Sequence, residues 1–257
     1  MNNYKTELKN IKTEWICNKL IAHRGLWSED IAENTITAFE NAVNHGFAIE
    51  TDVWRLKDDT LVIFHDDDLT RLCGVNKKIT DIENTEELKT YKIKGKDTIP
   101  TLDELLEVVN GKVELLIEIK TYEFNGKTEK LIYEKMKSYK GKYAIESFNF
   151  NSVMWFKKNA PEVVRGQLSG FFENNKAKGS KKFLLMLMKR LFFNPFNKPH
   201  FIAYDKKHYP NKYILKSRKK NISIILWTIQ SQEEYDQIKS EVDNVIFDGF
   251  VPKNTTN

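Results

Sequence analysis

The chain has 257 residues, 40% of them hydrophobic, and its 41 Lys and Arg against 36 Asp and Glu give a net charge of +5. This length supports one large hydrophobic core and lies near the ~250 residues typical of a (β/α)₈ barrel, so we expect a single domain over residues 1–257. The positive charge is small, and the sequence has no basic arm, zinc-finger spacing or aromatic RNA-binding motif, which argues against nucleic acid as a partner.

The cysteines and the first residues indicate a cytoplasmic protein. Cys17 and Cys73 stand far apart in the sequence and form no Cys-x-x-Cys pair, which fits a reducing compartment. Residues 1–12 are polar and charged, whereas a secretory signal needs an apolar stretch. No apolar run reaches the ~20 residues that a membrane span requires.

Short β-rich segments alternate with helical segments along the chain. Strands are predicted at 19–23, 48–53, 113–119, 143–147, 163–168, 201–205, 223–228 and 244–247. Helices are predicted at 35–44, 102–109, 127–139, 152–159, 211–219 and 232–241. This alternation is typical of a parallel sheet with crossover helices. We predict a (β/α)₈ barrel with its core at 20–250, and an open doubly wound sheet is the alternative.

An additional segment, residues 56–100, separates the second and third predicted strands. It contains one short apolar strand at 61–64. We interpret it as an excursion from the barrel.

Carboxylates stand at the carboxyl ends of two predicted strands, where the catalytic residues of a (β/α)₈ barrel gather. Glu50 and Asp52 are two residues apart, so a strand points both to one face, and Glu118 and Lys120 repeat this spacing. Three converging carboxylates repel one another unless a cation compensates, and Mg²⁺ or Ca²⁺ prefers such oxygen ligands. The alternatives are an exposed edge strand for Glu50 and Asp52, and ordinary ion pairing for Glu118 and Lys120.

Two histidines, His23 and His65, directly follow apolar β-rich runs. An unperturbed pKa of ~6.5 lets histidine both accept and donate a proton near neutral pH, so the pair could serve the attacking and leaving oxygens of a phosphodiester. A hydrogen-bonded structural histidine is the alternative for each. We assign His45, His200 and His208 to that structural role.

A series of short motifs follows along the chain. In order they are His23-Arg24-Gly25, Glu33-Asn34-Thr35, Glu50-Thr51-Asp52-Val53, His65-Asp66, Ile99-Pro100-Thr101-Leu102, Ile117-Glu118-Ile119-Lys120, Ser147-Phe148 and Trp227-Thr228. Each motif alone is weak, but the ordered set resembles the glycerophosphodiester phosphodiesterase family in its cytoplasmic bacterial form. The resemblance covers about residues 20–250, nearly the whole chain.

The resemblance implies a (β/α)₈ barrel with a single catalytic centre. In it, His23 and His65 act as general acid and base. Glu50, Asp52 and Glu118 hold one divalent cation, Mg²⁺ or Ca²⁺. The reaction implied is hydrolysis of a small-molecule glycerophosphodiester to sn-glycerol 3-phosphate and an alcohol.

The resemblance also assigns two phosphate-binding residues, Arg24 and Lys120. Arginine offers a planar fork that matches phosphate oxygens, and lysine offers a compact charge. Glu33, Ser147 and Trp227 are supporting residues, and Glu33 could reach either the cation or Arg24.

Other activities of a similar barrel are alternatives. These are a lysophospholipase D, a phosphoinositide-type phospholipase C and a non-catalytic barrel that binds phosphodiesters. Loss of His23, His65 or Glu50 would signal the non-catalytic barrel, and the sequence keeps all three.

Residues 181–193 form an almost wholly apolar stretch with basic ends, too short to span a bilayer. The stretch lies where a barrel helix belongs, and an ordinary helix with one buried face is the simplest interpretation. On helical spacing Lys182, Lys189 and Arg190 share one side, so the apolar face is wider than a globular helix needs. We expect apolar surface around 183–193 to be left over for a covering loop, a homodimer or a peripheral membrane contact.

Overall fold

The computed structural model describes residues 13–171 and 178–253, and its centre is a closed barrel of eight parallel strands. Each strand pairs with the next around the ring, and β1 closes the ring by pairing with both β2 and β11. The strands are β1 Ile21–His23, β2 Ala48–Arg55, β6 Leu115–Ile119, β7 Tyr143–Ser147, β8 Val164–Ser169, β9 Phe201–Asp205, β10 Ser223–Ile229 and β11 Asn244–Phe247. The predicted (β/α)₈ barrel is confirmed.

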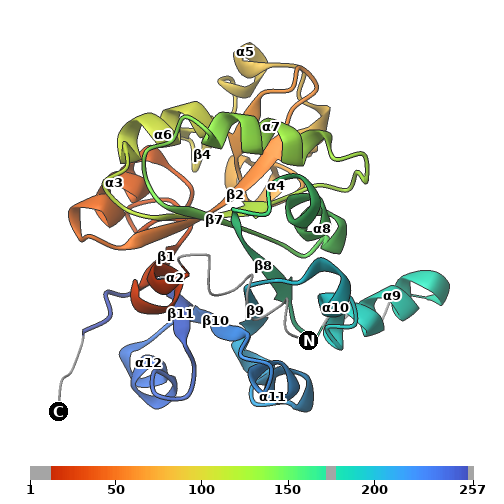
Figure 1. Cartoon of the computed structure of the whole chain (residues 1–257). Coiled ribbons are helices and arrows are strands. Elements are labelled where there is room, and N and C mark those ends of the chain that lie inside the picture. The colour runs from red at the N-terminus through yellow and green to blue at the C-terminus, as the bar shows by residue number, and fades with distance from the viewer. Residues whose placement is uncertain (1–12, 172–177, 254–257) are drawn as a thin grey trace.

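Helices surround the barrel (Figure 1). They are α3 Ile36–Asn44, α6 Leu102–Val109, α7 Lys127–Met136, α8 Phe150–Asn159, α11 Lys212–Arg218 and α12 Gln232–Ile238. All six were predicted within three residues at each end. Local sequence fixes several starts: Thr101 and Glu104 form a capping box at α6, and Ser231 caps α12.

The alternation of side chains along each strand divides the barrel into layers. Residues such as Ile49 and Ile117 point outward and pack against the helices. Ala48 and Leu116 point inward and join the apolar cluster that fills the amino-terminal half of the barrel. Two residues further along the same strands, the inward positions are Glu50 and Glu118, so the polar layer begins where the apolar filling ends.

A short helix that the sequence prediction missed, α2 Glu14–Asn18, closes the amino-terminal end of the barrel. Trp15 and Ile16 of this helix are buried in the interior apolar cluster. The Asn244 amide donates hydrogen bonds to the carbonyl oxygens of Ile16 and Lys19, at 2.8 and 2.7 Å. Five residues carry too little periodicity to be recognised as a helix.

The excursion between β2 and β6 has its own small core. It comprises β3 Leu61–Ile63, α4 Thr70–Cys73, the 3₁₀ turn η1 Ile79–Asp81, α5 Thr85–Leu88, β4 Lys92–Ile93 and β5 Asp97–Thr98. Strand β3 runs antiparallel to β2, with Val53 opposite Ile63. This pairing brings the chain after β3, which begins with Phe64 and His65, back to the carboxyl end of the barrel.

The segment between β8 and β9 departs from an ordinary barrel helix. It contains α9 Gly179–Lys189 and α10 Asn194–Asn197, and the short turn η2 Lys206–His208 follows β9. No described side chain of α9 is buried, but Leu185 to Lys189 are half-buried, and Leu191, which follows the helix, is buried in the main core. Phe183, Leu184 and Phe192 are exposed, which confirms the expected surplus of apolar surface.

We expect the substitution Ile16→Ala to lower the free energy of unfolding by about 2–5 kcal/mol, because Ile16 is fully buried where α2 closes the barrel. Denaturant unfolding followed by circular dichroism measures this. Leu215→Ala on α11 is the matched control, since Leu215 is 46% exposed and should change stability by under about 0.5 kcal/mol. Equal effects of the two substitutions would contradict the role of α2.

Candidate active site

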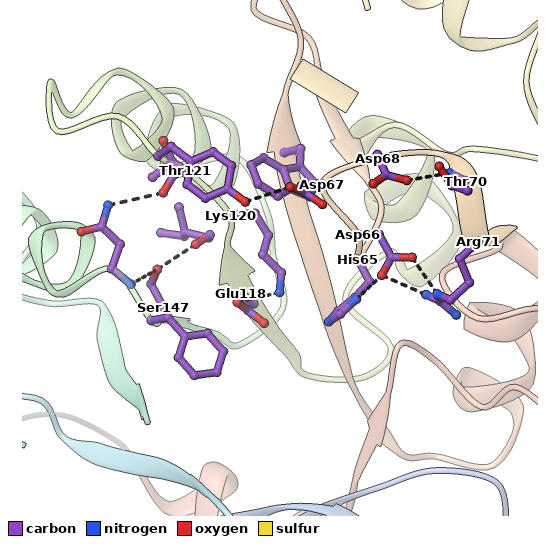
Figure 2. A pocket seen from close by; sticks show the side chains of 15 residues that line it. His65, Asp66, Asp67, Asp68, Thr70, Arg71, Glu118, Lys120, Thr121 and Ser147 are labelled. Atoms are coloured by element: carbon purple, nitrogen blue, oxygen red, sulfur yellow. Dashed lines mark hydrogen bonds and ion pairs between the residues drawn. The ribbon is translucent and has the colours of Figure 1, made fainter. Parts of the chain in front are cut away.

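Two cavities open at the carboxyl ends of the barrel strands, and His65, Glu118 and Phe148 line both. The inner cavity, of about 280 Å³, is lined by His23, Arg24, Glu50, His65, Glu118, Glu146, Phe148, Leu168, Trp227, Thr228 and Ile246. The outer cavity, of about 640 Å³, extends from Glu118 and Lys120 to Asp66, Asp67 and Arg71 of the excursion (Figure 2). The predicted histidines and most of the predicted charged residues therefore meet in one place.

Glu50, Asp52 and Glu118 converge in the interior of the barrel. One oxygen atom from each lies within 4.8 Å of the other two, and all three residues are buried. The alternative of an exposed edge strand for Glu50 and Asp52 is wrong, because β2 lies between β1 and β6 in a closed sheet.

Two cationic side chains contact this carboxylate cluster. Lys120 Nζ lies 3.1 Å from Asp52 Oδ1 and 2.8 Å from Glu118 Oε1. Arg24 Nε lies 3.7 Å from Asp52 Oδ2, and the Arg24 backbone N–H donates to Glu50 Oε2 at 3.1 Å. Burial acts to raise the pKa of Asp52, but the charges of Lys120, His65 and Arg24 outweigh it and hold that pKa far below the usual range.

A fourth interior carboxylate, Glu146, was missed by the sequence analysis. It is 1% exposed, lies beside Glu118 in the β6–β7 register, and its Oε2 has no hydrogen-bond partner among the described residues. We singled out Ser147 because it ends the strand, whereas the two-residue alternation from Ala144 points Glu146 inward. Four interior carboxylates thus face two cations, Arg24 and Lys120.

The excess of negative charge changes the pKa values of the buried carboxylates. Burial and neighbouring carboxylates raise the pKa of Glu50 and Glu146 well above the usual value. Burial raises the pKa of Glu118 to about 7 despite the Lys120 ammonium. Buried carboxylate oxygens in excess over cations form a donor set that fits a hard divalent cation such as Mg²⁺ or Ca²⁺.

His23 ends β1 and lies against two carboxylates of the site. Its Nδ1 is 3.0 Å from Asp248 Oδ2, and its Nε2 is 3.9 Å from Glu50 Oε2. Burial lowers the pKa of His23, although the hydrogen bond to Asp248 opposes the shift. Because Asp248 contacts Nδ1, it orients the ring so that Nε2 lies on the side of Glu50.

His65 belongs to a charged network that joins the excursion to the barrel. Its Nδ1 lies 2.7 Å from Asp66 Oδ1, and Asp66 Oδ2 accepts a hydrogen bond from Arg71 Nε at 2.6 Å. Arg71 also binds Glu33, which pairs with Arg24 at 2.6 Å. Glu33 therefore holds Arg24 through a direct ion pair. Burial lowers the pKa of His65 below its ordinary value.

Ser147 and Trp227 occupy different positions around the cavities. Ser147 Oγ donates to the Ile119 carbonyl at 2.7 Å and accepts from the Asn149 backbone N–H at 3.0 Å, so it fixes the loop that carries Phe148. Trp227 lines the inner cavity, packs edge-on against Phe148 at 5.8 Å, and its buried indole N–H has no hydrogen-bond partner among the described residues.

We expect the chelator-treated protein to lose at least about 1 kcal/mol of stability between pH 6.5 and pH 8. Glu118, with a folded pKa of about 7, and Glu50 and Glu146, with raised pKa values, release protons in the folded state that the unfolded chain has already lost by pH 6.5. Stability therefore falls as pH rises through these folded pKa values. Below pH 6.5 the lowered pKa of His23 contributes the opposite slope.

Thermal unfolding at a series of pH values measures this stability change. A saturating divalent cation should flatten the dependence of stability on pH. In the chelator-treated protein, Glu118→Gln should also reduce this dependence. A slope that neither change alters would rule out the carboxylate cluster as its source.

The chain was compared with known proteins. The model of the glycerophosphoryl diester phosphodiesterase family matches residues 23–250. A glycerophosphodiester phosphodiesterase from Caldanaerobacter subterraneus subsp. tengcongensis is 32% identical over 246 residues, which cover 89% of this chain and 93% of that protein. The lysophospholipase D GDPD1 of Mus musculus is 33% identical over 163 residues, covering 58% of this chain and 50% of that protein.

A solved structure has a similar fold. It is a phosphodiesterase of Oleispira antarctica in complex with the product sn-glycerol-3-phosphate, with a TM-score of 0.73, 23% identity, and coverage of 89% of this chain and 92% of that chain. The family model, the long alignment and the barrel agree with the motifs of the sequence. The chain therefore belongs to the glycerophosphoryl diester phosphodiesterase family and is an enzyme of the phosphoric diester hydrolase class.

Proposed function

We propose that the enzyme hydrolyses glycerophosphodiesters to sn-glycerol 3-phosphate and an alcohol, with a divalent cation bound by Glu50, Asp52 and Glu118. The observation that carries the proposal is that both histidines line the same inner cavity as Glu50 and Glu118. When bound, the cation would neutralise charge on the phosphate oxygens. The surplus of interior carboxylates supports a cation, because buried carboxylates are costly without compensation.

His23 and His65 serve in this proposal as the general acid and base. The lowered pKa of each keeps the ring neutral near pH 7, and a neutral ring has one nitrogen that accepts a proton and one that donates. Asp248 and Asp66 bind the Nδ1 atoms and so orient the opposite nitrogens. One histidine accepts the proton of the entering oxygen and the other donates a proton to the leaving oxygen.

Arg24 and Lys120 bind the phosphate in this proposal. Both side chains line a cavity beside the carboxylate cluster, Arg24 the inner one and Lys120 the outer one. Each could form an ion pair with an anionic phosphate there. Glu33, through its pair with Arg24, is a supporting residue, as are Ser147 and Trp227 through their contacts with the Phe148 region. The product complex of the Oleispira antarctica phosphodiesterase supports a glycerol 3-phosphate site.

The alcohol portion of the substrate occupies the outer cavity. This cavity adjoins Glu118, Lys120 and His65 and is large enough, at about 640 Å³, for a head group beyond the phosphate. The volume also supports a second candidate activity, lysophospholipase D, which the likeness to the Mus musculus protein favours. Assays of glycerophosphocholine against lysophosphatidylcholine separate the two activities.

We propose further that the whole chain of 257 residues acts as one catalytic domain in the cytoplasm. Cys17 and Cys73 are free thiols, which supports a reducing compartment.

We expect Glu50→Gln, Asp52→Asn and Glu118→Gln each to weaken cation binding by at least about tenfold, because each removes one charged ligand. Calorimetric titration of the chelator-treated protein with Mg²⁺ and Ca²⁺ measures the affinity, and a coupled assay of glycerol 3-phosphate release measures activity. Glu107→Gln, at an exposed position on α6, is the matched control. Full activity in excess chelator, with verified absence of metal, would contradict the cation requirement.

We expect His23→Ala and His65→Ala each to reduce kcat by about 10²–10⁴, because each removes one proton-transfer group. The double variant should be little slower than either single variant, since the two groups act as a unit. The rate of the unmodified enzyme should show a bell-shaped dependence on pH. Multiplicative losses in the double variant would show that the histidines act independently.

A further inference from the structure

The segment from α9 to α10 concentrates exposed apolar side chains. Of the nine large hydrophobic residues that are exposed in the described part of the chain, four lie here. They are Phe183, Leu184, Phe192 and Phe196, exposed by 59%, 38%, 52% and 55%. We call these four residues, with the exposed basic residues Lys182 and Arg190, the α9 surface. Exposed apolar groups gathered in one segment mark interaction sites.

Helix α9 is attached to the barrel mainly at its carboxyl end. The Met188 carbonyl accepts a hydrogen bond from Ser169 Oγ at 2.9 Å, and the Lys189 carbonyl accepts one from Tyr204 OH at 3.3 Å. Leu185 to Lys189 are half-buried, whereas the described residues before them are exposed. Figure 1 shows α9 at the periphery, beyond α10. An apolar helix held in this way leaves one face without a partner among the described residues.

The charge of the segment identifies the kind of partner. Residues 178–204 contain six basic residues and no acidic one. The basic residues are Lys178, Lys181, Lys182, Lys189, Arg190 and Lys198. Because the whole chain has a net charge of +5, the rest of the chain has a net charge of −1. The segment that exposes the apolar side chains therefore accounts for the net positive charge of the protein, because basic and acidic residues nearly balance in the rest of the chain.

A second copy of the chain is a poor occupant for this surface. A symmetric dimer through α9 would bring two basic segments together, and like charges that are desolvated at an interface repel strongly. An anionic lipid surface satisfies both features, since apolar side chains insert at the boundary of the acyl chains while Lys and Arg contact the headgroups. In the described residues no helix is long and apolar enough to cross a bilayer.

The carboxyl end of α9 lies at the same end of the barrel as the active site, whereas Phe196 of α10 lies toward the amino ends of the strands, where its carbonyl accepts a hydrogen bond from Lys157 in the last turn of α8. Ser169, which binds the carboxyl end of α9, is the last residue of β8, and catalytic residues lie beyond the carboxyl ends of the strands. Phe171 follows β8 and stacks on His208, which follows β9, while Lys189 Nζ lies 3.3 Å from the centroid of the Phe171 ring. A membrane in contact with the carboxyl end of α9 would therefore lie near the cavity end of the barrel.

We propose that the α9 surface binds anionic phospholipid membranes peripherally. Phe183, Leu184, Phe192 and Phe196 insert at the interface, and Lys182 and Arg190 contact the headgroups. This binding is separate from the proposed reaction and does not depend on the identity of the substrate.

Vesicle flotation tests the proposal with the full-length protein. The probes are vesicles of equimolar phosphatidylglycerol and phosphatidylcholine, and vesicles of phosphatidylcholine alone, at low and high salt. We expect binding to the anionic vesicles that weakens at high salt. The variants Phe183→Ser with Leu184→Ser, and Lys182→Glu with Arg190→Glu, should each weaken that binding by at least about tenfold.

Matched controls come from α11, where Leu215 and Lys216 are also exposed. Leu215→Ser with Lys216→Glu should bind vesicles like the unmodified protein. All variants should hydrolyse water-soluble glycerophosphocholine at the unmodified rate and keep the unmodified unfolding temperature, which separates this test from a test of the reaction.

Two results would overturn the proposal. One is absence of binding to anionic vesicles at low salt. The other is a dimer in light scattering that Phe183→Ser with Leu184→Ser converts to monomer, since that would assign the surface to a second copy.

Discussion

The constraint on which the rest of the structure depends is the excess of negative charge inside the barrel. Glu50, Asp52, Glu118 and Glu146 are buried within one polar layer, and Lys120 and Arg24 do not balance them. Asp52 is an anion beside Lys120 and Arg24, but burial raises the pKa values of the other three, so a further cation would stabilise their anionic forms. The same imbalance makes Glu50, Asp52 and Glu118 a set of oxygen ligands that could hold a divalent cation.

The closed sheet holds these like-charged side chains close together by fixing the backbone to which each is attached. A carboxylate on a loop can rotate away from its neighbours, but the backbone of Glu50 is hydrogen-bonded in a ladder on both sides of β2. The apolar filling below, from Ala48 and Leu116 to Trp15 of α2, prevents the side chains from retreating into the barrel. The apolar packing in the amino-terminal half of the barrel thus keeps the carboxylates close together in the carboxyl-terminal half, despite their repulsion.

The excursion completes the site from outside the barrel strands. His65 lies beyond β3, and its position depends on the pairing of β3 with β2 and on the path through Asp66 and Arg71 to Glu33. Because Glu33 also pairs with Arg24, the two histidine-bearing segments are held by one set of charges. The positions of His23 and His65 therefore depend on each other, which suits the paired acid and base roles that we propose for them.

The sequence by itself determined the order of strands and helices, because the two-residue and 3.6-residue periods of the apolar residues survive in a single chain. It also indicated Glu50, Asp52, Glu118 and the two histidines, since inward positions at strand ends follow from alternation. Only the tertiary structure decided the rest. Alternation along β7 could have indicated Glu146, but its place beside Glu118 follows from the pairing of β7 with β6. Asp248 reaches His23 because β11 pairs with β1, and α10 rather than α9 packs against α8. These outcomes depend on contacts between residues far apart in the sequence, and no local pattern records such contacts.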